Sequence, residues 1–167
     1  MKQSNQNNPK QKATVKSILK AHPEIKQVKI SYHGPKKPEL VQILSTKIAI
    51  ATLRDQYDKS TIDYKEFYYV MLLNRANFCI GICRIGEGNT HSCAVNLKEI
   101  CQLALLTNAS AVIVSHNHPS GRPDPSESDK LLNIKIKAAL KLLDIALLDD
   151  IIITSSTQYS FADEGLL

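Results

Sequence analysis

The sequence predicts a single domain that mixes helices and strands, an α/β protein of the α+β kind. Its 167 residues suit one domain, and 43% hydrophobic with 22% charged residues is ordinary for a folded globular chain. Residues 66–73 and 78–85 are two consecutive strand signals, which is the pattern of a β-hairpin. Residues 111–154 then follow the order strand, loop, helix, strand, so a strand-loop-helix-strand unit comes after the hairpin in the chain.

Local signals define the individual elements. Asn and Arg residues at 74–77 predict the hairpin turn, and 86–89 is expected to end the second strand. Asn96 followed by Glu99 predicts a capping box that opens a helix to about Asn108. Before the hairpin we expect disorder over 1–12, a helix over 13–21, a strand over 25–32, a turn over 34–38, and a helix from Ser45 or Thr46 to about Tyr57 with Ile48 and Leu53 inward. After the hairpin and its following helix we expect a buried central strand over 111–116, a helix from Ser126 to about Leu143, a strand over 146–154 and an edge strand over 159–161. The buried stripe of the helix from Ser126 is expected to consist of Leu132, Ile136, Ala139, Leu140 and Leu143.

Positive charge is concentrated at the N-terminus. Residues 1–40 contain nine lysines against two glutamates, whereas residues 41–167 carry 12 basic and 14 acidic side chains. We therefore expect a basic, partly disordered segment over 1–24 and the folded domain over 25–167. The segment 1–40 would make weak, salt-sensitive contact with nucleic-acid phosphates, or it would serve only as a solubilising tail.

Composition also bears on the compartment and on the cysteines. The chain has no run of about 18 apolar residues and no secretory signal at its N-terminus, so no membrane association is predicted and the cytoplasm is expected. Cysteines 79, 83, 93 and 101 are then expected as reduced, buried thiols. A structural metal site that includes His91 is the alternative, although the spacing matches no common zinc-finger pattern.

Side chains that can bind a metal follow the buried strand that ends at His116. Side chains alternate along a strand, so His116 and His118 leave it on one side and Asn117 on the other. A stiff loop rich in proline and glycine then leads to Asp129, whose carboxylate can supply a third ligand. Two histidines and one carboxylate leave the fourth tetrahedral position to water, as in catalytic zinc sites, and zinc lowers the pKa of that water to about 7.

Each of these residues also has a plainer interpretation. A lone histidine at a strand end is usually a polar loop residue, and Ser126 with Asp129 would form a helix cap. We expect the cap in either case, because it would fix the position of Asp129. The joint spacing His-x-His-x7-Ser-x2-Asp after an apolar strand favours a site for one zinc ion per chain.

This pattern, His116 to Gly121 followed by Pro125, Ser126 and Asp129, resembles the JAMM (MPN+) metalloprotease signature in its RadC form. The resemblance covers about residues 25–165. It implies a curved mixed β-sheet flanked by helices, as in JAMM domains and cytidine deaminases. Its other matching positions are Glu66-Phe67, Leu72 to Asn74, Gly88 to Thr90, the helix from Asn96, Leu148-Asp149 and Tyr159 to Gly165.

The resemblance also implies a role for each site residue. His116, His118 and Asp129 would hold zinc, and Ser126 would hydrogen-bond to the developing oxyanion or to the water. A glutamate ahead of the motif would be the general base, and Glu66 matches that position. It would take the proton from metal-bound water as this attacks an amide or isopeptide bond of a protein or peptide substrate. Glu87, in a polar turn, is the rival for this role.

Two positions depart from RadC-like sequences. Asp150 stands where they usually have histidine, and Asn133 where they usually have threonine. Neither is a ligand in the signature, so the departures bear on the substrate more than on the metal. The expected function is a zinc-dependent hydrolase with a link to DNA repair. The alternative is a non-enzymatic domain that binds DNA or protein in repair or mobile-element transfer; the substrate and the oligomeric state stay open.

Overall fold

The computed structural model describes residues 40–89 and 94–167, and within them five strands form one mixed β-sheet. The elements expected before residue 40 lie outside the described residues. The strands are β1 (Phe67–Leu73), β2 (Cys79–Glu87), β3 (Ala111–Asn117), β4 (Ala146–Ile153) and β5 (Gln158–Ser160), and the helices are α2 (Thr46–Arg54), α3 (Leu97–Leu106) and α4 (Glu127–Lys141).

The spatial order of the strands is β2-β1-β3-β4-β5. β1 is antiparallel to both β2 and β3, β3 and β4 are parallel, and β4 is antiparallel to β5. Parallel neighbours need a crossover connection, and α4 provides it between β3 and β4. The predicted mixed sheet with flanking helices is confirmed, and the N-terminus of α4 follows the loop that leaves the carboxyl end of β3.

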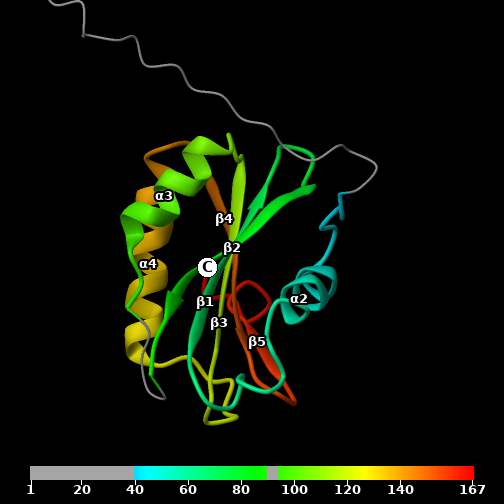
Figure 1. Ribbon diagram of the computed structural model, residues 1–167. Coiled ribbons are helices and arrows are strands. Elements are labelled where there is room, and N and C mark those ends of the chain that lie inside the picture. The colour runs from blue at the N-terminus through cyan, green and yellow to red at the C-terminus, as the bar shows by residue number, and fades with distance from the viewer. Residues whose placement is uncertain (1–39, 90–93) are drawn as a thin grey trace, which may run out of the picture. The chain divides into compact units, whose positions relative to one another are not determined.

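Helices cover both faces of the sheet (Figure 1), with α2 on one face and α3 and α4 on the other. Strand residues alternate between two apolar clusters. Met71 and Ile113 pack on the α2 side, and Val70 and Val114 pack on the α3 and α4 side. All seven residues of β3 are buried, as a central strand requires. Within the described residues, no helix is long and apolar enough to cross a bilayer.

The hairpin turn lies where the sequence predicts it, but the second strand is longer. The Asn74 side chain accepts a hydrogen bond from the Ala76 N–H at 2.9 Å, and Asn77 adopts a φ of 58°, which asparagine tolerates well. β2 runs through Gly86 to Glu87, so the predicted break at Gly86 is wrong. Pairing with β1 continues to that point because register shifts absorb the irregularities.

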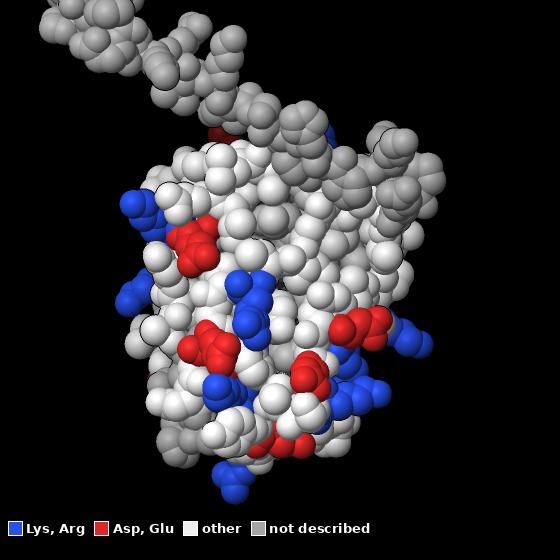
Figure 2. Space-filling view, viewed as in Figure 1, with Lys and Arg blue, Asp and Glu red and all other residues white. Residues whose placement is uncertain are grey.

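The predicted helix starts are confirmed at Ser45 and Asn96, with one difference in detail. The Asn96 side chain accepts from the N–H of Lys98 and not from that of Glu99, so the expected capping box is not formed. α2 ends at Arg54, before the expected Tyr57. Positive and negative side chains are interspersed over the described surface in the view of Figure 2, as the near-balanced charge after residue 40 predicts.

The buried side of α4 is more polar than the sequence predicts. Ile136 and Leu140 are buried as expected. Leu143 was expected in this stripe, but it is 36% exposed because the helix ends at Lys141. A polar residue, Asn133, occupies a buried place on the helix with 2% of its surface exposed. The Asn133 side chain donates a hydrogen bond to Asp150.

Candidate metal centre

Three donor atoms converge at the carboxyl end of β3. His116, His118 and Asp129 each offer one ligand atom, and these atoms lie within 4.8 Å of one another. The two imidazole Nε2 atoms are 3.0 Å apart. The Asp129 carboxylate oxygens lie 3.5 Å from His116 Nε2 and 3.6 Å from His118 Nε2. In the part of the chain that the structure describes, this is the one group of three such residues that can hold a metal ion.

These distances fit a tetrahedral zinc ion. Zinc binds imidazole nitrogen and carboxylate oxygen at about 2.0–2.1 Å, which places two tetrahedral ligand atoms roughly 3.3 Å apart. The observed separations bracket that value: 3.0 Å between the two Nε2 atoms, 3.5 Å from His116 Nε2 to Asp129 Oδ1 and 3.6 Å from His118 Nε2 to Asp129 Oδ2. Three protein ligands leave one tetrahedral position for water or substrate, the arrangement of catalytic zinc sites.

The tautomer of His118 is set by the loop that follows it. Its Nδ1 lies 2.8 Å from the backbone carbonyl oxygen of Arg122, which can only accept a hydrogen bond. Nδ1 must therefore carry the proton, and the lone pair of a neutral ring lies on Nε2, facing the site. Between His118 and Arg122 the backbone forms a tight turn, in which the Gly121 N–H donates to the His118 carbonyl oxygen at 3.1 Å.

Asp129 is oriented by the predicted helix cap. The Ser126 hydroxyl and the Ser126 N–H both donate to Asp129 Oδ2, at 2.5 and 2.7 Å, and the Asp129 N–H donates back to the Ser126 hydroxyl. Burial acts to raise the pKa of Asp129, but the neighbouring His116 and His118 side chains outweigh it and hold that pKa well below its usual value. The carboxylate is thus ionised and available to a cation.

Ser126 itself faces the cap. Its hydroxyl contacts Asp129 Oδ2 and lies 2.8 Å from the hydroxyl of Ser128. A hydroxyl has one proton, and Ser126 donates it to Asp129 Oδ2 in this structure. These contacts therefore do not test the expected role of Ser126 as a donor to an oxyanion. What the structure shows is a residue that holds a candidate ligand in place.

Glu66 lies beside the same site although it is distant in sequence. Tyr68 pairs with His116 across β1 and β3, so two residues earlier on the antiparallel strand Glu66 comes opposite His118, on the same face. Its side chain is 9% exposed. Burial raises the pKa of Glu66, while the neighbouring His116 and His118 partly offset this effect. A raised pKa makes a carboxylate a stronger base, which favours its acceptance of a proton from water.

Asn117 fixes the backbone that carries Glu66. Its side-chain oxygen accepts from the Phe67 N–H at 2.7 Å, and its amide donates to the carbonyls of Ile62 and Lys65 at 2.6 and 2.7 Å. Asn117 is fully buried. Asn117, which lies between the two histidines in sequence, therefore holds the backbone of residues 62–67 next to the end of β3. Strand alternation indicated its direction, but nothing in the sequence indicated these partners.

Glu87, the rival base, lies elsewhere. Its carboxylate forms an ion pair with Lys65 at 2.8 Å and lies 3.6 Å from Arg84. The side chain is 44% exposed, and the Lys65 hydrogen bond lowers its pKa. Both properties are those of a solvated surface carboxylate. Of the two glutamates, Glu66 is the one that interacts with the candidate ligands.

The two positions that depart from the expected pattern contact each other behind His116. Asn133 Nδ2 donates to Asp150 Oδ2 at 3.1 Å, and Asp150 Oδ1 lies 3.8 Å from His116 Nδ1. Burial raises the pKa of Asp150 to about 6, although His116 acts to lower it. The Tyr68 ring stacks on the His116 ring with a centroid distance of 5.6 Å.

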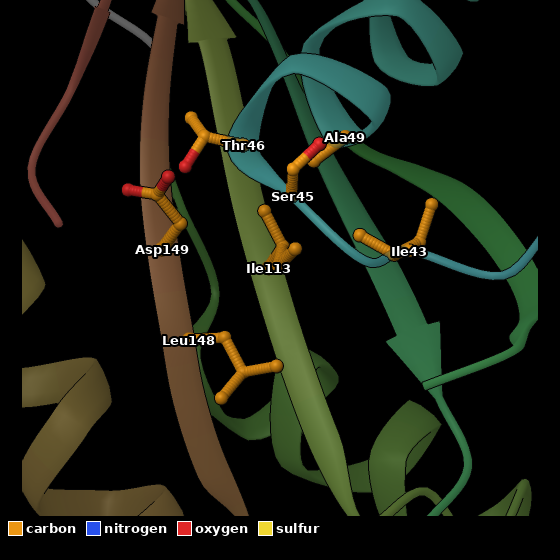
Figure 3. Close-up of a pocket in the computed structure, with 7 residues that line it drawn as sticks. All are labelled: Ile43, Ser45, Thr46, Ala49, Ile113, Leu148 and Asp149. Atoms are coloured by element: carbon orange, nitrogen blue, oxygen red, sulfur yellow. The ribbon is translucent and has the colours of Figure 1, made fainter. Parts of the chain in front are cut away.

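The neighbouring carboxylate, Asp149, points to the opposite face of the sheet. It lines a hollow of about 150 Å³ beneath α2, next to Thr46 and Ile113 (Figure 3). It accepts hydrogen bonds from the Ser160 hydroxyl and the Ala162 N–H, which tie the C-terminal turn to β4. Asp149 is therefore a structural residue, separate from the candidate metal centre.

The cysteines give no second centre within the described residues. Cys79, Cys83 and Cys101 are free thiols, as expected of a reduced chain, but they are half-buried and not buried as predicted. The alternative metal site included His91, and that residue, like Cys93, lies outside the described residues.

Ser126→Ala should weaken both the helix and the candidate site. Loss of the cap should cost about 1 kcal/mol of unfolding free energy, and metal affinity should fall about 10-fold because Asp129 is no longer held. Ser45→Ala is the control, because the Ser45 side chain also caps a helix, α2, which packs on the other face of the sheet from α4. It should show a similar loss in urea unfolding with unchanged zinc affinity. Equal zinc affinity in both variants would contradict the positioning of Asp129 by the cap.

Comparison with known proteins places this geometry in a family. Residues 43–166 match the family model described as the RadC-like JAB domain. A UPF0758 protein of Aromatoleum aromaticum is 44% identical over 103 residues, which are 61% of this chain and 46% of that protein. A UPF0758 protein of Flavobacterium johnsoniae is 35% identical over 128 residues, 77% of this chain and 55% of that protein. The chain thus spans about half the length of these relatives, and their names state no activity.

Proposed function

The chain belongs to the RadC-like JAB domain family, and on that basis we propose that it is a zinc-dependent hydrolase of amide or isopeptide bonds. The observation that carries this proposal is the convergence of His116, His118 and Asp129 next to a buried glutamate, Glu66. A site that served only structure would need the ligands and would gain nothing from a carboxyl group with a raised pKa.

The proposed chemistry divides the work among four residues. His116, His118 and Asp129 would hold the ion, which when bound supplies Lewis acidity toward a carbonyl and acidifies water. Glu66 would accept a proton from the attacking water and return it to the nitrogen of the leaving amine. The Glu66 carboxylate would thereby end the reaction in its starting protonation state. Burial of Glu66 favours this shuttle, because it brings the proton affinity of the carboxyl group closer to neutrality.

Ser126 would have a second task in this scheme. Its hydroxyl proton now bonds to Asp129 Oδ2, and it would turn toward the oxygen on which negative charge develops. We keep this task apart from the cap, since the cap alone accounts for the contacts of the hydroxyl.

Cleavage can be tested with a broad set of candidate substrates. Zinc-loaded and chelator-stripped protein would be incubated with a proteome-derived peptide library and with lysine-branched isopeptides, and new termini would be read by mass spectrometry. We expect cleavage with zinc and none after stripping. Cleavage that survives stripping, or none with zinc present, would count against a zinc hydrolase.

A second proposal is favoured by the nine lysines of residues 1–40. In it the chain contacts nucleic acid through phosphates and acts as a non-enzymatic accessory in DNA repair or mobile-element transfer. Its mark would be duplex binding that weakens steeply with salt and is lost when residues 1–24 are deleted. Absence of duplex binding even at low salt would remove its support.

A further inference from the structure

We propose that Asp150 and Asn133 are positioning residues that hold His116 with its Nε2 lone pair toward the metal centre. The inference rests on the proposed zinc site and concerns two residues outside its ligand set. In this arrangement the buried Asp150 carboxylate, which Asn133 holds by a hydrogen bond, sets the tautomer and orientation of His116 from the Nδ1 side of its ring.

The first observation is a pair of buried atoms that face each other. His116 Nδ1 and Asp150 Oδ1 are 3.8 Å apart, and each side chain is 2% exposed. Neither atom has a hydrogen-bond partner among the described residues. At 3.8 Å the two atoms lie just beyond hydrogen-bond distance. Buried polar atoms without partners are costly, so we infer that a small shift of either side chain joins this nitrogen and this carboxylate oxygen in a hydrogen bond.

The second observation concerns the other oxygen of the same carboxylate. Asp150 Oδ2 accepts from Asn133 Nδ2 at 3.1 Å, and Asn133 is 2% exposed. This bond leaves Oδ1 as the oxygen free to face His116. An amide that donates from a helix fixes the carboxylate plane, which a lone aspartate on a strand could not achieve by itself.

The third observation is that one helix reaches both sides of the His116 ring. Asp129 and Asn133 are four residues apart on α4 and therefore lie on one face of it. Asp129 approaches Nε2 at 3.5 Å, and Asn133 acts on the Nδ1 side through Asp150. The stacked ring of Tyr68 restricts rotation of the imidazole between them.

The physical effect follows from imidazole chemistry. A neutral ring has one protonated nitrogen, and an acceptor facing Nδ1 places the proton there, which leaves the Nε2 lone pair for a metal. His118 obtains the same result from the Arg122 carbonyl. A carboxylate behind a metal-binding histidine also raises its basicity, and loss of such a partner typically costs about 10–100-fold in metal affinity.

The test compares four variants by zinc affinity and by the nitrogen-bound proton of His116. Asp150→Leu removes the acceptor, Asp150→Asn keeps an acceptor oxygen without the charge, and Asn133→Ala removes the donor behind it. Asp149→Asn is the matched control, because it removes the charge of a neighbouring buried carboxylate on the other face of the sheet and keeps the side-chain oxygen that accepts from the Asp150 N–H. Affinity is measured by competition with a chromogenic chelator, and the Nδ1 proton is observed by nitrogen-15 NMR of the zinc-loaded protein.

We expect zinc affinity to fall about 10–100-fold in Asp150→Leu, less in Asp150→Asn and Asn133→Ala, and not at all in Asp149→Asn. The Nδ1 proton should exchange slowly in the wild type and rapidly in Asp150→Leu. A purely structural role would lower thermal stability in the Asp150 and Asn133 variants and leave zinc affinity and the Nδ1 proton signal unchanged.

Two outcomes separate this inference from the proposed function. If wild-type protein binds zinc and the Asp150 and Asn133 variants bind it equally well, the positioning pair is disproved and the metal site stands. If wild-type protein binds no zinc, the metal site fails and the inference falls with it. Should Asp150→Leu not fold, the conservative Asp150→Asn and Asn133→Ala decide, since unchanged affinity and proton exchange in both would overturn the proposal.

Discussion

Replacing Glu66 by glutamine should abolish hydrolysis while leaving one zinc ion per chain. Glutamine has the shape of glutamate but cannot take a proton from water or return it to an amine, and general acid–base catalysis of this kind contributes about 10²–10⁴-fold to a rate. Glu66 is not among the converging donor atoms, so metal content should not change. The measurements are the rate on a cleaved peptide and the zinc content by elemental analysis.

Glu87→Gln is the control for this experiment. It removes a carboxylate that is paired with Lys65 on the surface, and the rate should stay within about twofold of wild type. Full activity in Glu66→Gln would move the base to another residue. Loss of zinc in that variant would instead make Glu66 a ligand.

Glu66→Gln should also stabilise the metal-free protein at neutral pH. Burial raises the folded-state pKa of Glu66 above the ordinary value of 4.5, so the folded state binds more protons than the unfolded state just above pH 4.5. Stability from this group is present below the ordinary pKa and is lost as pH rises through the raised one. The gain in the variant should therefore grow between these two pKa values and vanish in more acidic solution, as urea unfolding across pH would show.

Asp129→Ala and His116→Ala should each remove zinc from the protein. Either change leaves two of the three converging ligands, and affinity should fall by at least about 100-fold, beyond the effect of losing an outer partner. Zinc measured after gel filtration should drop from about one per chain to near zero.

Asp163→Ala is the matched control for a lost carboxylate. Asp163 is exposed and accepts a hydrogen bond from Thr46, remote from the metal centre, so zinc should be retained. Zinc retained in both Asp129→Ala and His116→Ala would refute the ligand assignment.

The sequence predicts the part of the site that lies along one stretch of chain. The alternation of a buried strand is enough to put His116 and His118 together, and the cap at Ser126 is enough to orient Asp129. These are local rules of geometry, and they transfer directly to the fold. The individual strands and helices follow from the same kind of local signal, whereas the curved mixed sheet was implied by the family resemblance.

Contacts made across the sheet could not be predicted in this way. Glu66 lies near His116 and His118 because β1 pairs with β3, whereas β2 and α3 lie between them in the sequence. The choice between Glu66 and Glu87 depends on that pairing and on the ion pair with Lys65, and neither is visible in a single sequence. Leu143 was misplaced because nothing local shows that α4 ends at Lys141.

The buried Asn117 side chain joins the end of β3 to the backbone of residues 62–67. Its three hydrogen bonds connect β3 to the backbone at Ile62, Lys65 and Phe67. Local opening of residues 62–67 must break these bonds, so their amides should exchange with deuterium as one cooperative unit with the end of β3. An ion bound by the two histidines would then also slow the opening of residues 62–67, which include Glu66 but none of the three metal-ligand candidates.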